Sequence, residues 1–156
     1  MKRFLCILLA TIASLNTLSL LAQRAEVGTR APRLRGVEWI SDPLEKSSRA
    51  LMVEFFHSTN SDSREHVEHL NALACYYRND MDVVVLTREP AEQVTSMLLH
   101  EYQYCYVATN ESGEMFASYD VSHVPYAVII DPRGVIIWMG NPLTLTDQTI
   151  KKLLQK

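Results

Sequence analysis

The chain has 156 residues, of which 47% are hydrophobic and 21% are charged, and its formal net charge is −3. This length suits about one domain, and the apolar fraction excludes a disordered or fibrous chain. No basic excess is present to neutralise phosphates, so no nucleic-acid partner is expected. The three cysteines are too few for a disulfide scaffold, and no Cys-x-x-Cys pair occurs.

The first segment has the features of an export signal. Two basic residues precede an apolar run over residues 4–21, and the small residue Ala22 follows it. This pattern predicts a signal peptide over residues 1–22, cleaved after Ala22, and a secreted or periplasmic protein. An uncleaved anchor is the alternative, but polar residues interrupt the run of about 20 apolar residues that a span requires. A membrane partner is expected only if the segment is retained.

The remaining residues, 23–156, are interpreted as one domain. Residues 50–56 are nearly all apolar, which is typical of a strand covered on both faces. Residues 58–63 are all Ser, Thr, Asn or Asp and lead into a helix, for which Asp62 and Glu65 can form a capping box. Apolar residues at helical spacing continue that helix as far as Tyr77.

The second half predicts further alternation. Residues 83–86 form the next buried strand, and Pro90 fits the first turn of a second helix. Residues 126–130 and 135–139 are apolar runs joined by Asp-Pro-Arg-Gly, a sequence that suits a type I turn and indicates a hairpin. Thr146 can cap a last helix, with Leu145 and Ile150 as a hydrophobic staple. The predicted fold class is α/β, a three-layer α/β/α sandwich around a mixed sheet with a C-terminal hairpin and helix.

Four segments carry a resemblance to a known family: residues 27–32, 53–56, 119–125 and 129–134. In that order, they resemble the opening, the first core strand, the cis-proline segment and the hairpin of the thioredoxin fold. The similarity is to secreted proteins of the TlpA/redoxin type and covers about residues 27–154. It implies a cis-proline at Pro125 and, for a typical member, thiol-disulfide oxidoreductase activity.

The chain departs from this family at the active site. Where the family has Cys-x-x-Cys, the sequence reads Asn60-Ser61-Asp62-Ser63. Disulfide exchange needs an attacking thiolate and a resolving thiol, and neither Asn60 nor Ser63 supplies one. Asn, Ser and Asp are instead good helix-capping residues. We therefore expect no catalytic residue and no cofactor at this loop, although the resemblance is to enzymes.

Glu54 lies in an otherwise apolar strand, at the position where thioredoxin-fold enzymes keep an acid as a proton relay. Burial disfavours the charged carboxylate, so we expect a raised pKa. Glu54 is either a retained general acid/base or a relic that a nearby polar group or water satisfies. Without thiols to serve, the second interpretation is favoured.

Two cysteines remain in the predicted domain. Cys75 is placed away from the apolar face of its helix, and Cys105 lies in a short, half-buried extended segment. A bridge needs Cα atoms within about 7 Å, and these elements need not be neighbours, so two free thiols are expected. An atypical oxidoreductase that uses Cys75 or Cys105 is the alternative function.

Histidines suggest a second alternative, a zinc or copper site. His57 and His123 lie on loops that face each other in this fold and could converge near Asp62 or Glu54, while His66 and His69 can share a helix face. No recognised ligand spacing occurs, so solvated or capping histidines and no metal are favoured.

The leading hypothesis is a redox-inactive module that binds an extended polypeptide or another envelope protein beside the cis-proline loop. The residues expected to line the groove come from the two loops and their flanks: Phe56, His57, Ser58, Asn60, Asp62, His123, Val124 and Pro125.

Overall fold

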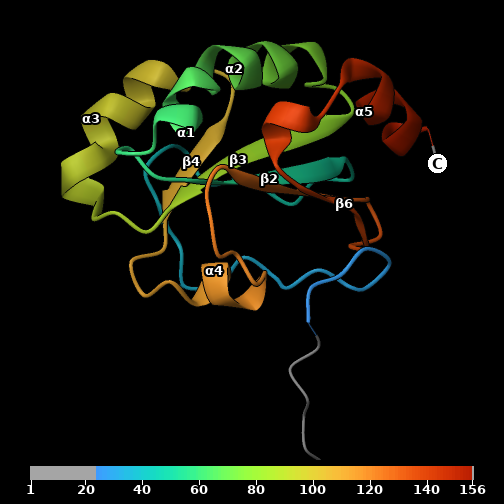
Figure 1. The fold of residues 1–156 in the computed structure, drawn as a ribbon, viewed down its shortest axis with the longest axis horizontal. Coiled ribbons are helices and arrows are strands. Elements are labelled where there is room, and N and C mark those ends of the chain that lie inside the picture. Colours follow the sequence, from blue (N-terminus) through green and yellow to red (C-terminus); the bar gives the residue numbers. More distant parts are fainter. Residues whose placement is uncertain (1–23, 156) are drawn as a thin grey trace, which may run out of the picture.

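The structure, a computed structural model, describes residues 24–155. The predicted signal peptide lies outside the described residues. Six strands form one sheet in the order β1-β4-β3-β2-β5-β6 (Figure 1). The strands are β1 (Glu38–Trp39), β2 (Ala50–Phe56), β3 (Met81–Thr87), β4 (Tyr106–Thr109), β5 (Tyr126–Ile130) and β6 (Ile136–Gly140). The helices are α1 (Ser61–Glu65), α2 (Val67–Tyr76), α3 (Ala91–Glu101), α4 (Glu114–Ser118) and α5 (Asp147–Leu154), with a 3-10 turn over Pro142–Thr144.

The sheet is mixed, as predicted. β2 pairs in parallel with β3 over seven residue pairs, and β3 pairs in parallel with β4. β5 and β6 run antiparallel and form the predicted hairpin, in which the Gly134 amide donates to the Asp131 carbonyl at 2.9 Å. The two-residue strand β1 closes the other edge against β4. The sequence analysis assigned neither β1 nor α4, and it gave the start of β4 only as a short extended segment around Cys105.

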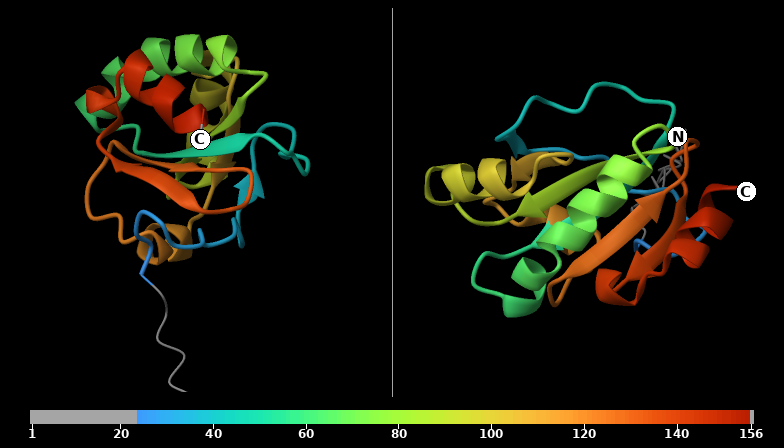
Figure 2. Two further views of the ribbon diagram at one scale, coloured as in Figure 1. Left: turned by 90° about the vertical axis from the view of Figure 1, so that its right-hand side faces the viewer. Right: turned by 90° about the horizontal axis from the view of Figure 1, so that it is seen from above.

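Helices cover the two faces unequally. Helices α1, α2, α3 and α5 lie on one face, whereas α4 and the segment before β1 (residues 24–37) lie on the other (Figures 1 and 2). Each face has its own hydrophobic core. One joins Leu70, Leu98 and Ile150 to the sheet, and the other packs Phe116 against Phe55 with ring centroids 4.8 Å apart. Burying a side chain of this size contributes about 1.5–3 kcal/mol, so both faces stabilise the predicted three-layer sandwich.

The last helix begins where the sequence predicts. The Thr146 side chain accepts a hydrogen bond from the Thr149 amide at 3.2 Å. Both staple residues, Leu145 and Ile150, are buried. Pro90 precedes α3 and is not part of its first turn as predicted, because the helix begins at Ala91. Among residues 24–155, no helix combines the length and apolarity needed to cross a membrane.

Candidate binding site where two loops meet

Two loops meet at one end of the sheet because the strands that carry them are neighbours. β2 pairs antiparallel with β5, and Phe55 lies opposite Tyr126. The loop that leaves β2, residues 57–60, therefore lies beside the segment that enters β5, residues 122–125. The peptide bond before Pro125 is cis, as the sequence analysis predicted.

The segment before Pro125 presents unpaired main chain. Ser122 and His123 are exposed, and Val124 is half-buried. Within residues 24–155, the N–H and C=O groups of residues 122–124 make no backbone hydrogen bond. The His123 ring lies edge-on to Tyr126, with centroids 5.6 Å apart. Main-chain donors and acceptors are therefore available at the surface beside the first loop.

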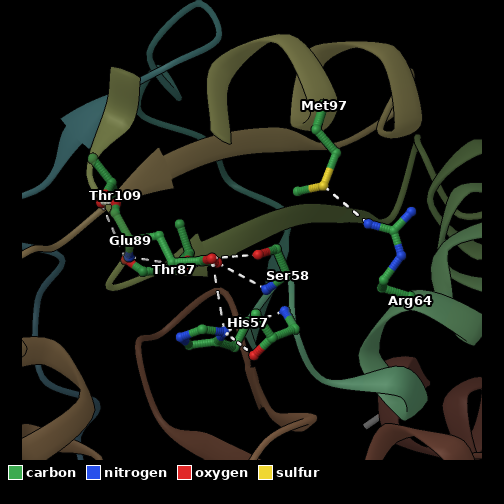
Figure 3. Close-up of polar contacts among 8 residues, drawn as sticks. His57, Ser58, Arg64, Thr87, Glu89, Met97 and Thr109 are labelled. Carbon is green, nitrogen blue, oxygen red and sulfur yellow. Dashed lines mark hydrogen bonds and ion pairs between the residues drawn. The ribbon is translucent and has the colours of Figure 1, made fainter. Parts of the chain in front are cut away.

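Glu89 fixes the loop that follows β2 (Figure 3). Its carboxylate accepts hydrogen bonds from the Ser58 amide at 2.8 Å, from the Ser58 hydroxyl, and from the Thr87 hydroxyl at 2.9 Å. His57 Nδ1 lies 3.7 Å from the same carboxylate. Burial alone would raise the pKa of Glu89, but the hydrogen bonds and His57 together hold it below its usual value. The sequence analysis did not identify Glu89, which follows the end of β3.

Asn60 caps helix α1. Its backbone is extended, and its Oδ1 accepts a hydrogen bond from the Ser63 amide at 2.8 Å. The predicted capping box of Asp62 and Glu65 is therefore wrong, because Asp62 already lies inside the first turn. The wider interpretation, that this loop caps its helix, is confirmed.

Arg64 ties α1 to α3. Its guanidinium donates to Glu101 Oε1 at 2.9 Å and to the Met97 sulfur at 3.1 Å. Both contacts join elements more than 30 positions apart in the sequence. The helix beside the candidate site is thus anchored at its start by Asn60 and near its end by Arg64.

A buried acid–histidine pair lies beneath this helix. Glu54 is fully buried, and His66 is only 3% exposed. His66 Nδ1 lies 3.2 Å from Glu54 Oε2 and 3.3 Å from Oε1. Burial raises the pKa of Glu54, and the contact with His66 opposes this shift, so the predicted direction is confirmed. The predicted solvated or capping role for His66 is wrong, because the ring faces the core and makes no capping hydrogen bond.

In the part of the chain that the structure describes, polar atoms of the pair and its surroundings lack hydrogen-bond partners. Within residues 24–155, Ser63 Oγ, His66 Nε2 and the Tyr102 hydroxyl are buried without a hydrogen-bond partner. Burial and the charge of Glu54 both raise the pKa of Tyr102. Buried polar groups of this kind are normally satisfied by an ordered water. The polar interior below α1 is therefore larger than the predicted single acid.

Cys75 and Cys105, the two cysteines among residues 24–155, are free and half-buried. This agrees with the prediction of two free thiols and with the half-buried placement of Cys105. Cys75 is less exposed than its predicted outward position implied. Burial, and to a lesser extent the charge of Glu54, raises the pKa of the Cys105 thiol. A thiol in such surroundings is a poor nucleophile.

The histidines do not gather around one acid. His57 lies beside Glu89, His123 contacts Ser122 and Tyr126, and His66 contacts Glu54. The convergence of His57 and His123 on Asp62 or Glu54, which the zinc or copper alternative required, is not seen, because each ring has separate contacts. The rings of His66 and His69 do share a face, with centroids 5.1 Å apart. Within the described residues, no group of three or more His, Cys, Asp or Glu is arranged to hold a metal ion.

The structure divides the predicted lining residues into two sets. Phe56 is fully buried, and its ring packs against Tyr102 with centroids 5.8 Å apart, so its side chain cannot contact a partner. Pro125 is buried as well. The residues that are exposed or half-buried near the two loops are His57, Ser58, Asn60, Asp62, His123 and Val124.

Comparison with solved structures identifies the fold. A protein assigned as a thiol:disulfide interchange protein DsbE from Chlorobium tepidum matches with a TM-score of 0.69 and 18% identity, over 83% of this chain and 99% of that one. The C-terminal domain of an assigned thiol-disulfide oxidoreductase from Bacteroides thetaiotaomicron matches with a TM-score of 0.64 and 14% identity, over 84% and 95% of the two chains.

A third neighbour is the exposed lipoprotein thioredoxin of Streptococcus pneumoniae, with a TM-score of 0.60 and 16% identity over 70% of this chain and 86% of that one. No protein-family model matches the sequence, and no curated protein matches it significantly. Similarity at these identities establishes the fold alone. The fold is thioredoxin-like, as the sequence resemblance implied.

Proposed function

We propose that this thioredoxin-like domain binds an extended polypeptide of the cell envelope, without disulfide exchange, where residues 57–60 meet residues 122–125. The observation that carries the proposal is the main chain of residues 122–124, whose polar groups make no backbone hydrogen bond within residues 24–155. An extended guest can pair with such groups and gain affinity from main-chain hydrogen bonds.

The chemistry of α1 supports binding rather than exchange. The helix begins with Asn60 as its cap and Ser63 in its first turn, where thioredoxin-like oxidoreductases carry their cysteine pair. An amide and a hydroxyl cannot form the mixed disulfide that exchange requires. Of the two cysteines in the described residues, Cys105 has a pKa raised by burial. This disfavours the alternative of an oxidoreductase that uses that thiol.

The first loop is rigid enough to serve as one wall of a binding site. Glu89 fixes Ser58 through both its amide and its hydroxyl. A preformed loop loses little conformational entropy when a guest arrives, which favours affinity. The side chains beside it are mostly polar, with His57, Asp62 and His123 at or near the surface. Guest recognition would therefore depend chiefly on main-chain pairing.

We also propose export to the periplasm or cell exterior. The basic start and apolar run over residues 1–22 support this localisation. A neighbour in fold is named an exposed lipoprotein, which is consistent with the same environment. An envelope polypeptide is accordingly the class of guest that the domain would meet.

Nuclear magnetic resonance tests the proposal. The isotope-labelled protein is titrated with a reduced and carboxymethylated unfolded protein, which offers extended chain and no thiol. We expect amide shift changes concentrated in residues 57–62 and 121–126. Changes confined to other surfaces would refute the proposed groove.

A turnover assay separates binding from catalysis. Disulfide reduction with dithiothreitol is measured for the wild-type protein and for the Cys75→Ser/Cys105→Ser variant. We expect the background rate from both proteins. A wild-type rate that disappears in the double variant would instead establish the oxidoreductase function.

A further inference from the structure

A groove lined by arginines runs along α4, on the face of the sheet opposite to α1 and α2. Its volume is about 690 Å³. Residues from the range 24–35 form one wall, and α4 with the residues that follow it forms the other. The charged residues that line it are Arg24, Arg30, Arg33 and Arg35 with Glu114 and Asp120.

The charge of this groove is opposite to that of the whole chain. The protein has 18 acidic and 15 basic residues, a formal net charge of −3. Four of the basic residues but only two of the acidic ones line the groove. One of these acids, Asp120, already forms an ion pair with Arg24 at 2.9 Å. Positive charge is thus concentrated on one surface of an acidic protein, which favours an anionic partner there.

Three of the arginines are available to such a partner. Arg30, Arg33 and Arg35 are exposed, and within residues 24–155 they form no ion pair. An arginine guanidinium offers a planar fork of donors that matches phosphate oxygens. The groove therefore provides three guanidinium groups without an ion-pair partner in the described chain, all within six consecutive residues.

The backbone that carries them is fixed. The Ala31 amide donates to the Gly134 carbonyl at 2.9 Å, and the Pro32 carbonyl accepts from the Tyr119 hydroxyl at 2.7 Å. The Arg35 amide contacts the Met115 sulfur at 3.4 Å. These contacts hold the segment against the β5–β6 turn and α4, so the arginines share a preorganised surface.

The position of the groove in the chain indicates which anion it meets. Arg24, the first described residue, lines the groove, and the apolar run of residues 4–21 ends three positions before it. Three residues span at most about 11 Å. A chain that has this run in a bilayer therefore has the groove beside the phosphate layer, where basic residues are attracted to anionic headgroups.

We propose that the arginine groove along α4 is a docking surface for the phosphate headgroups of an anionic bilayer. The proposal concerns the chain that keeps its apolar run, the alternative to cleavage after Ala22, because only the retained run brings the groove next to the headgroups. The surface is distinct from the proposed peptide groove, and either function can fail without the other.

Hydrogen exchange of the full chain on lipid vesicles tests this proposal. The chain is placed on vesicles of phosphatidylcholine alone or of phosphatidylcholine with phosphatidylglycerol. We expect amides of residues 30–35 and 114–118 to exchange at least roughly threefold more slowly on the anionic vesicles, as a mainly docked surface requires. High salt should abolish the difference, because headgroup attraction is screened.

Two triple variants provide the control. Arg30→Gln/Arg33→Gln/Arg35→Gln should lose the protection, while Lys46→Gln/Arg78→Gln/Lys152→Gln, which removes the same charge from other exposed positions, should retain it. Equal loss in both variants would overturn the proposal, since net charge alone would explain the binding. Two other outcomes would also overturn the proposal. If inorganic phosphate added to phosphatidylcholine vesicles slows exchange of the same amides, the groove binds a small anion. If polyglutamate slows their exchange and phosphatidylglycerol does not, the groove binds an acidic protein.

Discussion

His66 Nδ1 lies 3.2 Å from a carboxylate oxygen of Glu54, and both side chains are buried between β2 and the start of α2. In the folded protein, each side chain has the other as its hydrogen-bonding partner in place of water. Taking an ionisable pair out of water is costly, and its attraction compensates only when the geometry is good. The pair therefore makes folding sensitive both to pH and to the loss of either partner.

The Glu54→Gln variant should change the pH dependence of stability. The folded-state pKa of Glu54 is raised above its ordinary value of 4.5. Its contribution to stability is therefore fully present below the unfolded-state pKa and is lost as the pH rises through the folded-state pKa. Relative to Glu54→Gln, the wild type should lose about 1.4 kcal/mol for each unit by which the pKa is raised. Denaturant unfolding across this pH range measures the difference, and parallel curves for the two proteins would contradict the assignment.

Removing only the histidine should be severe. His66→Leu leaves the Glu54 carboxyl buried without its partner, which costs about 3–5 kcal/mol. The Glu54→Leu/His66→Leu variant should recover much of this loss, because no unpaired group remains. His100→Leu, at an exposed position in the last turn of α3, should change the free energy of unfolding by less than about 0.5 kcal/mol. A double-mutant cycle by urea unfolding measures the coupling, and additive costs would mean that the contact is not stabilising.

Glu89→Ala should loosen the loop at the proposed peptide groove. The variant leaves the Ser58 amide and the Thr87 hydroxyl without their acceptor, which costs about 1–3 kcal/mol. The pKa of Glu89 is lowered, so its contribution is present above the unfolded-state pKa and is lost as the pH falls through the folded-state value. Exchange of the Ser58 amide and thermal unfolding at neutral and acidic pH measure both effects.

Glu111→Ala is the matched control for this change, since Glu111 is an exposed acid in a loop. It should leave the exchange rate of the Ser58 amide and the stability almost unchanged. If Glu89→Ala differs from this control only at acidic pH, the contacts seen at the loop do not stabilise the ionised carboxylate.

Local patterns predicted the elements whose signals lie within a few residues. The apolar run of β2, the Asp-Pro-Arg-Gly turn and the Thr146 cap each depend on neighbours in the sequence. β1 has two residues and α4 has five, so neither contains enough residues to show a period. Their placement depends on pairing with β4 and packing against Phe55, which a local pattern does not encode.

The candidate site was predictable in position but not in its contacts. The resemblance located the two loops and the cis-proline, because their residues match a known order. His66 is 12 positions from Glu54, and Glu89 is 31 positions from Ser58. Both contacts arise only when the chain folds. Phe56 was predicted to line the groove but is buried. The sequence does not decide between these positions, because the last residue of a buried strand can face either the core or the loop end of the sheet.

Asn60→Ala and Asp62→Ala distinguish the observed cap of α1 from the predicted one. Asn60 accepts the Ser63 amide, so its loss should cost about 1 kcal/mol. Asp62 is exposed in the first turn and forms no capping hydrogen bond, so its loss should cost less than about 0.5 kcal/mol through the helix dipole. Urea unfolding measures both values, and the reverse order of costs would restore the Asp62–Glu65 capping box.

Thiol alkylation tests whether Cys105 is suited to exchange chemistry. The Cys75→Ser variant leaves Cys105 as the cysteine of the described domain. Burial and the charge of Glu54 raise the thiol pKa, so the reactive thiolate is scarce at slightly alkaline pH. Iodoacetamide should therefore modify Cys105 in the folded variant at least tenfold more slowly than it modifies free cysteine, a difference of roughly one pKa unit or more. The same residue should react at an ordinary rate in urea, where burial is removed. A folded-state rate equal to or above that of free cysteine would show an activated thiol, and the oxidoreductase alternative would then displace the binding module.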